Sequence, residues 1–206
     1  MTDQLLPRRS VLYMPGANER ALEKAKTIPA DALILDLEDA VAPDAKAEAR
    51  ERVCAAAASE RLTVLVMGTN DLAKELQAVQ IPGREPLLPA LAMCLLGARA
   101  AGKVILDGVY NDIKDPDGFH AECVQARHLG FDGKTLIHPS QVDDANQVWA
   151  PSEEAIEDAR ALIATFDAAL AEGKGVVTHN GRMIENLHVA NAQRVLAVAD
   201  AIAARS

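Results

Sequence analysis

The hydrophobic positions of the chain fall into short apolar runs, and these runs alternate with longer Ala-rich stretches of helical periodicity. The apolar runs are rich in Val, Leu and Ile and end at Gly, Pro, Asn or Asp, which is typical of buried strands. Five strands are predicted, over residues 10–16, 31–39, 62–68, 103–110 and 134–141. Helices are predicted over residues 18–28, 42–59, 86–102 and 115–130, and residues 69–77 run off the third strand. Repeated β-then-α units predict a parallel sheet, either doubly wound or closed into a (β/α)8 barrel.

The pattern changes at residue 151. A long amphipathic helix is predicted over residues 151–173, because Pro151 and several acidic residues occupy its first turn. A Gly-rich extended segment follows over residues 174–185, and a terminal helix is predicted over residues 186–206. We therefore expect an α/β domain over residues 1–150 and a helical extension over residues 151–206.

Composition narrows the possible functions. The chain has 206 residues, of which 50% are hydrophobic but only 3% aromatic, so Ala, Leu and Val must fill the core. The net charge of -9 argues against nucleic-acid and membrane-surface binding, because both partners present negative charge. A phosphate-bearing small molecule still fits if one local basic cluster holds it. Cys54, Cys94 and Cys123 show no CxxC spacing and are expected to be buried free thiols in a cytoplasmic protein.

Polar residues gather where the predicted strands end. The second strand runs into Asp36 and Glu38, which share one face with Ile34 because side chains alternate along a strand. Two inward carboxylates need a cation, hydrogen-bond donors or water, because a bare buried charge is costly. Oxygen ligands from strand ends favour Mg2+. A single Asp after a strand is equally typical of a helix cap, and Asp39 is interpreted in that way.

The other strand ends add to this set. They contribute Asn70 and Asp71, Asp107 and Asp112, and His138 and Gln141. His138 precedes Pro139 and could serve a ligand or the structure alone. In parallel α/β folds ligands bind at the carboxyl ends of the strands, so these residues are the candidates for a site.

Five stretches taken together resemble one known family. They are "SVLYMPGANERALEKA", "LILDLEDAVAPDAKAEAR", "MGTNDLAKEL", "GKTLIHPSQV" and "GRMIE". In this order they are similar to the citrate lyase β-subunit-like proteins of the HpcH/HpaI aldolase group, which include malyl-CoA and citramalyl-CoA lyases. The resemblance implies a phosphoenolpyruvate/pyruvate-domain-like TIM barrel with a C-terminal helical extension that packs on a neighbouring subunit. It also implies a trimer or hexamer and Mg2+-dependent cleavage or formation of a carbon–carbon bond beside a CoA thioester.

The resemblance assigns roles to the acidic residues. Asp71 matches the family's metal-binding Asp, and Asp36 with Glu38 match the acidic pair that orients metal-bound waters. Glu185 stands where the family usually carries an Asp that reaches the site of a neighbouring subunit. Glu keeps the acid and adds one methylene group, which changes its geometry there. The resemblance implies that Glu185 acts in proton transfer or in activating water for thioester hydrolysis.

The resemblance also implies a CoA site. Tyr13, Arg20 and Lys24 match CoA contacts, and the two cations lie one helical turn apart. They would form the basic cluster that a net-acidic protein needs for CoA phosphates. Thr135 and Leu136 match a backbone contact near the ligand.

One departure is larger than any substitution. Between "ERVCAAAAS" and "ERLTVLVMG" the family has three further βα units, which this sequence lacks. Those units carry an Arg that grips the substrate carboxylate and a metal-ligating Glu. Five strands therefore remain where a closed barrel of this type needs eight. Three explanations stay open: a longer natural protein, an internal deletion with a defective product, or an open and rewired fold. The sequences on the two sides of this junction do not look adapted to being neighbours, which favours the first two explanations.

The expected activity is that of a CoA-ester carbon–carbon lyase. Its substrate would be a short β-hydroxyacyl-CoA such as malyl-, citramalyl- or citryl-CoA, which yields an acyl-CoA and an oxo-acid. The alternatives are a malyl- or citramalyl-CoA thioesterase and a catalytically impaired chain that binds CoA or joins oligomers. An aldolase for free sugar acids is disfavoured by Arg20 and Lys24, which indicate CoA.

Overall fold

The computed structural model describes residues 7–15, 27–36, 64–173 and 177–205. The chain divides into two compact units, one over Arg8–Trp149 and one that contains Ala150–Ser206. The predicted helices over residues 18–28 and 42–59 lie almost wholly outside the described residues. Each unit is described below by itself.

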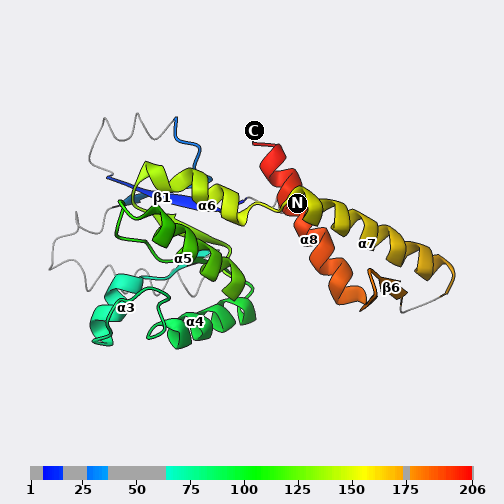
Figure 1. The fold of residues 1–206 in the computed structure, drawn as a ribbon, viewed down its shortest axis with the longest axis horizontal. Coiled ribbons are helices and arrows are strands. Elements are labelled where there is room, and N and C mark those ends of the chain that lie inside the picture. Colours follow the sequence, from blue (N-terminus) through cyan, green and yellow to red (C-terminus); the bar gives the residue numbers. More distant parts are fainter. Residues whose placement is uncertain (1–6, 16–26, 37–63, 174–176, 206) are drawn as a thin grey trace. The chain divides into compact units, whose positions relative to one another are not determined.

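The first unit is built on a parallel sheet of five strands (Figure 1). The strands are β1 (Ser10–Pro15), β2 (Ala32–Asp36), β3 (Val64–Val66), β4 (Val104–Asp107) and β5 (Gly133–Leu136). Their spatial order is β2-β1-β5-β4-β3, and every neighbouring pair runs parallel. The prediction of five strands in a parallel α/β sheet is confirmed.

The strand order separates the two predicted topologies. A doubly wound sheet of the flavodoxin type would place β3 beside β1. Here β5 lies beside β1, and β2 and β3 are the two outer strands among the described residues. A (β/α)8 barrel that lacks three consecutive strands after its second one would have the same strand order. The described strands form a parallel sheet and do not form a closed barrel.

Among the described residues, three helices contact the sheet. They are α4 (Leu88–Ala100) against β4, α5 (Pro116–Leu129) against β5, and α6 (Val142–Trp149) against β1 and β5. A short helix α3 (Thr69–Glu75) follows β3 directly. Figure 1 shows α4, α5 and α6 in succession along the sheet. The core between sheet and helices contains the fully buried residues Leu12, Leu91, Cys123 and Leu136.

Gly130 and Gly133 are two of the glycines that the backbone of this unit requires. Gly130 ends α5 with a φ of 107°, a left-handed conformation that suits Gly, which confirms the predicted helix stop. Gly133 begins β5 beside β1, and a Cβ atom there would collide with the carbonyl oxygen of Arg8. The backbones of these two segments therefore approach more closely than any side chain would allow.

Two local predictions were wrong. The fifth strand ends at Leu136, and Pro139–Gln141 forms a 3-10 turn that leads into α6, a helix the sequence analysis did not predict. Pro139 cannot donate to a sheet, so the strand ends before it. The cysteines also differ from expectation, because Cys123 is buried but Cys94 is exposed on α4; Cys54 lies outside the described residues.

The second unit pairs two helices with a β-hairpin. Helix α7 (Glu153–Ala171) contacts α8 (Asn186–Ala203), and β6 (Val177–His179) pairs antiparallel with β7 (Arg182–Ile184). Asn180 and Gly181 make the turn with positive φ values of 47° and 74°, as an Asn-Gly hairpin turn requires. No helix among the described residues is both long and apolar enough to cross a membrane.

Candidate active site

The carboxyl ends of the five parallel strands lie at one edge of the sheet. In the register of β1 and β2, Tyr13 lies beside Ile34 and Pro15 beside Asp36, so Asp36 is the last paired residue of its strand. The backbones of Tyr13 and Asp36 are described, whereas their side chains are not. Arg20, Lys24 and Glu38 lie outside the described residues. The roles predicted for these five residues remain predictions.

The predicted metal ligand, Asp71, lies in the first turn of α3, next to the end of β3. Its side chain is exposed. Gly68 directly precedes the helix, and its carbonyl oxygen accepts a 2.9 Å hydrogen bond from the amide of Leu72. The short connection from β3 to α3 thus presents one carboxylate at the edge where the strands end.

Asp71 does not gather further metal ligands in the part of the chain that is described. Among those residues no three His, Cys, Asp or Glu side chains lie close enough together to hold one metal ion. Mg2+ is commonly held by one or two carboxylates, with waters and substrate oxygens filling the other positions. A single exposed Asp is therefore a possible ligand but not a complete protein site.

The predicted ligand contact at Thr135 and Leu136 falls on β5, where both side chains are buried. The Thr135 hydroxyl donates a 3.0 Å hydrogen bond to the carbonyl oxygen of Asp107 on the neighbouring strand. Residues 135 and 136 pair in register with Val11 and Leu12 of β1. A ligand can therefore contact only the backbone of Thr135 and Leu136. This backbone lies next to β1, the strand that carries Tyr13.

His138 has a structural environment. Its Nδ1 accepts a 3.2 Å hydrogen bond from the amide of Ser140, which caps the turn before α6. Gln141 accepts hydrogen bonds from the amides of Ile137 and His138 and donates to the carbonyl of Tyr110 at 3.1 Å. These two strand-end residues therefore hold the loops in place, which explains their polar character without a ligand.

The structure also reveals a buried charge quartet between the sheet and its helices, made of Arg84, Asp107, Glu122 and Lys134. Asp107 ends β4 and accepts hydrogen bonds from Arg84 at 2.8 and 2.9 Å and from Lys134 at 2.7 Å. Lys134 also donates to Glu122 of α5 at 2.6 Å. The side chains of Asp107 and Lys134 are 0% exposed. The sequence analysis placed Asp107 among the site candidates, but this network occupies its side chain.

The quartet is electrically balanced, with two cations and two carboxylates. Buried charges are tolerated only when they are paired and hydrogen-bonded, which is the case for Asp107 and Lys134. One donor is left over, because the buried Nη2 of Arg84 has no hydrogen-bond partner among the described residues. A Lys within an apolar strand was the sequence signal that could have revealed this network.

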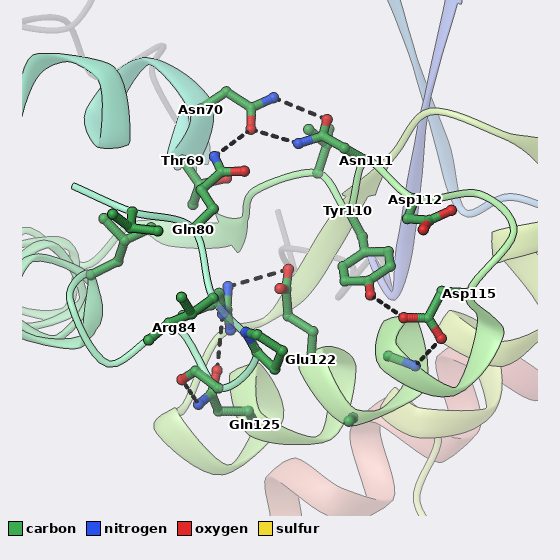
Figure 2. Close-up of a pocket in the computed structure, with 18 residues that line it drawn as sticks. Thr69, Asn70, Gln80, Arg84, Tyr110, Asn111, Asp112, Asp115, Glu122 and Gln125 are labelled. Atoms are coloured by element: carbon green, nitrogen blue, oxygen red, sulfur yellow. Dashed lines mark hydrogen bonds and ion pairs between the residues drawn. The ribbon is translucent and has the colours of Figure 1, made fainter. Parts of the chain in front are cut away.

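A pocket of about 400 Å³ adjoins the quartet, between the α3–α4 connection and α5 (Figure 2). Tyr110 lies on its far side from Arg84 and donates a 2.7 Å hydrogen bond to Asp115. Asp115 also accepts from the amide of Gly118 at the start of α5, at 2.9 Å. The hydrogen bond to Asp115 raises the pKa of Tyr110 to about 12, and the same bond lowers the pKa of Asp115.

Glu185 precedes α8 in the second unit and caps that helix. Its carbonyl oxygen accepts a 2.9 Å hydrogen bond from the amide of His188, and Nδ1 of His188 accepts a 3.0 Å hydrogen bond from the amide of Glu185. Glu185 is exposed, as are the flanking apolar side chains of Met183 and Leu187. The role predicted for Glu185 at a neighbouring subunit's site remains a prediction.

Comparison with known proteins identifies the family. The family described as HpcH/HpaI aldolase/citrate lyase matches two segments, residues 9–59 and 53–139, which together span most of the first unit. The chain belongs to the HpcH/HpaI aldolase/citrate lyase family. The family resemblance predicted from the sequence motifs is thereby confirmed.

Two relatives illustrate this family membership. The chain is 41% identical to a (3S)-malyl-CoA thioesterase of Cereibacter sphaeroides over 281 aligned positions, which cover 99% of each protein. It is 37% identical to the citrate lyase subunit beta of Leuconostoc mesenteroides subsp. cremoris, over 70% of this chain and 48% of that protein. The first alignment exceeds the 206 residues of this chain by 75 positions, so at least that many positions of the thioesterase have no counterpart here.

Solved structures support the fold assignment. The CitE protein of Mycobacterium tuberculosis, solved with magnesium, acetoacetate and coenzyme A, matches with a TM-score of 0.68 and 22% identity over 93% of this chain and 97% of that one. A citrate lyase of Burkholderia xenovorans matches with a TM-score of 0.63 and 16% identity over 97% and 93%. At these identities the likeness shows the α/β fold alone.

Proposed function

We propose that this chain acts on a short β-hydroxyacyl-CoA of the malyl-CoA type, with CoA bound at the carboxyl ends of the neighbouring strands β1 and β5. The observation that carries the proposal is the alignment with the (3S)-malyl-CoA thioesterase, which extends over 99% of both proteins. The site residues support it, because Tyr13 lies on β1 and the backbone of Thr135 and Leu136 lies on the adjacent β5. Arg20 and Lys24 follow β1 in the sequence and would supply the cations for the CoA phosphates.

The chemistry requires an electrophile at the strand ends. A bound Mg2+ would supply Lewis-acid polarisation of the substrate's oxygen, and Asp71 is the residue that would hold it. Asp36 and Glu38 would accept hydrogen bonds from water beside Asp71. Glu185 of a neighbouring subunit would take or return a proton, or activate water for hydrolysis of the thioester. In such a trimer or hexamer the exposed Met183 and Leu187 beside Glu185 would be covered.

Two reactions are compatible with this arrangement. Carbon–carbon cleavage of malyl-CoA yields acetyl-CoA and glyoxylate, whereas hydrolysis consumes water and yields malate and free CoA. The protein would be incubated with malyl-CoA or citramalyl-CoA and Mg2+, and the products separated by chromatography. Oxo-acid without free thiol identifies the lyase, and free thiol without oxo-acid identifies the thioesterase.

A second function is favoured by the missing positions. The described sheet has five strands, and no three metal-ligating side chains come together among the described residues. A chain of this kind could bind CoA esters without turnover, or join oligomers of its relatives. Saturable binding of CoA, measured by calorimetry, combined with no product from either ester would identify this binding function. Absence of both binding and turnover would contradict both proposals.

A further inference from the structure

A pair of side-chain amides joins the segments that follow β3 and β4, and we call this pair, Asn70 and Asn111, the amide bridge. Nδ2 of Asn70 donates a 3.1 Å hydrogen bond to Oδ1 of Asn111, and Nδ2 of Asn111 donates a 2.8 Å bond back to Oδ1 of Asn70. Gln80 donates to the same oxygen of Asn70 at 3.0 Å. Figure 2 shows the three side chains directed toward one another. The oxygen of Asn70 therefore has a donor for each of its two lone pairs.

The amide bridge adjoins the predicted metal ligand in the chain. Asn70 directly precedes Asp71 in the first turn of α3. Successive side chains of a helix point about 100° apart, so Asn70 can pair with Asn111 while Asp71 faces another direction. The Asp71 carboxylate turns back toward Gly68, since a Cβ atom added to Gly68 would lie 3.7 Å from Oδ2 of Asp71. Holding the side chain of Asn70 therefore holds the turn that carries Asp71.

The ends of β3 and β4 are in close contact beneath the amide bridge. The amide of Met67 donates a 3.0 Å hydrogen bond to the carbonyl oxygen of Leu106 on β4. Gly108 is buried, and a Cβ atom there would collide with the side chain of Thr69 and the carbonyl oxygen of Met67. The segment that carries Asp71 thus lies directly against the segment that carries Asn111.

The segment after β4 is also tied to the end of β5. The carbonyl oxygen of Tyr110, the neighbour of Asn111, accepts a 3.1 Å hydrogen bond from Gln141. Gln141 is only 4% exposed, and its side-chain oxygen accepts from the amides of Ile137 and His138, which follow β5. A continuous set of hydrogen bonds therefore runs from the turn of Asp71 to the end of β5, where the predicted CoA contact lies.

Stability alone does not account for the amide bridge. Both hydrogen bonds between Asn70 and Asn111 are exposed, so water competes for them and their net contribution to folding is small. Two reciprocal bonds do fix the separation of the segments that they join. Groups that orient a metal ligand from outside act in this way, and their loss weakens metal binding although no ligand is removed.

We propose that Asn70 and Asn111 are positioning residues that hold the Asp71 carboxylate in place relative to the ends of β4 and β5. This inference rests on the proposed metal role of Asp71 and adds two residues that act through it. With the amide bridge intact, the turn is ordered before a metal arrives, so binding has less ordering to do.

Hydrogen exchange in the metal-free, full-length protein tests whether the bridge holds the turn. The amide of Leu72 bonds to the carbonyl of Gly68 within this turn and reports its opening. Asn111→Ala should accelerate exchange at Leu72 about fivefold, the change expected for one net hydrogen bond. Gln147→Ala removes a carboxamide from the exposed surface of α6 and should leave this rate unchanged.

Mn2+ affinity tests whether the held turn serves the metal. Asn70→Ala and Asn111→Ala should each bind Mn2+ about fivefold more weakly than the parent, as followed by the paramagnetic signal of the ion. The double variant should bind no more weakly than either single one, because each change breaks the same bridge. Thermal unfolding of these variants should match that of Gln147→Ala, which separates positioning from loss of folded protein.

The outcomes separate this inference from the proposed function. If Asp71→Asn loses Mn2+ affinity, unchanged affinity in Asn111→Ala or unchanged exchange at Leu72 would overturn the positioning role and leave the metal role of Asp71 intact. Additive losses in the double variant would also overturn it, because the two residues would then act separately. If Asp71→Asn binds Mn2+ as tightly as the parent, the metal role itself fails and the positioning role fails with it.

Discussion

Asp107 of the charge quartet and Asp71 of α3 both lie near the ends of strands, but the two carboxylates differ in burial and in partners. Asp107 is fully buried and binds two cations within 2.9 Å. Asp71 is exposed, and no cluster of metal ligands forms around it among the described residues. A buried carboxylate with its partners in place contributes to the stability of the fold, because losing a partner leaves a bare charge. An exposed carboxylate costs little to keep and is free to meet a ligand.

The largest effect is expected from breaking the quartet. Lys134→Met would leave Asp107 and Glu122 with Arg84 as their one remaining cation among the described residues and should lower the free energy of unfolding by about 3–5 kcal/mol. Unfolding in urea measures this change, and Asp71→Asn is the control, expected to stay within about 0.5 kcal/mol of the parent. Adding Glu122→Gln to Lys134→Met should recover part of the loss. Equal stability of Lys134→Met and the parent would show that the quartet is not a stabilising element.

The next prediction concerns Asp71, the exposed carboxylate beside the end of β3. Asp71→Asn removes the predicted metal ligand and should reduce any Mg2+-dependent turnover of malyl-CoA on the order of 100-fold, since Lewis-acid catalysis supplies several kcal/mol. Divalent-ion affinity, followed by the paramagnetic signal of added Mn2+, should fall in the same variant at least tenfold. The control is Asp117→Asn, an exposed Asp in the first turn of α5. Unchanged Mn2+ binding in Asp71→Asn would remove Asp71 from the metal site.

Glu185 is exposed, as Asp71 is, and it also has a structural position at the start of α8, as Asp107 has in the quartet. Glu185→Ala should destabilise the second unit by about 0.3–1 kcal/mol, because α8 loses a carboxylate at its positive N-terminal end. Glu185→Asp keeps this carboxylate, so thermal unfolding should match the parent within error. If Glu185 also serves a neighbouring subunit, Glu185→Ala loses turnover and Glu185→Asp retains it. Full turnover in Glu185→Ala would limit this residue to its capping role.

The smallest effect concerns the partly exposed pair of Tyr110 and Asp115. The pKa of Tyr110 is raised to about 12, so the folded state holds the phenolic proton more tightly than the unfolded state does. The contribution of this pair is therefore complete below the usual tyrosine pKa of about 10 and is lost as the pH rises toward 12. The tyrosinate absorbance should show a transition near pH 12 that Tyr110→Phe removes. A parent protein whose tyrosines all titrate at the ordinary value would contradict this pairing.

Much of the fold could be predicted from local pattern. Apolar runs ending at Gly, Pro or Asp located all five strands of the sheet, because a strand buried on both faces has a continuous hydrophobic signature. Helix α6 was missed, since its eight residues are fewer than the usual helix and follow a run that resembles a strand. The exposure of Cys94 was missed because α4 is apolar on its outer face as well, with Met93 and Leu96 exposed.

The candidate site could be predicted only in part. Strand-end polarity drew attention to Asp107, Asp71 and His138 equally, although the structure gives Asp107 a buried network and His138 a capping role. Residue type and position in a strand do not distinguish a buried ion pair, a helix cap and a metal ligand. The role of each residue depends on partners that are distant in the sequence. Arg84 lies 23 positions from Asp107 in the chain and gave no sequence signal of its own.

The sequence by itself determined the family, the alternation of strands and helices and the lack of three of the family's βα units, because all of these depend on motifs and periodicity along the chain. The tertiary structure decided the strand order, which differs from that of a flavodoxin-type doubly wound sheet. It also decided which charges are buried. The physical reason is that burial and pairing arise only when distant segments pack together, and the free-energy cost of an unpaired charge then fixes which partners each one has.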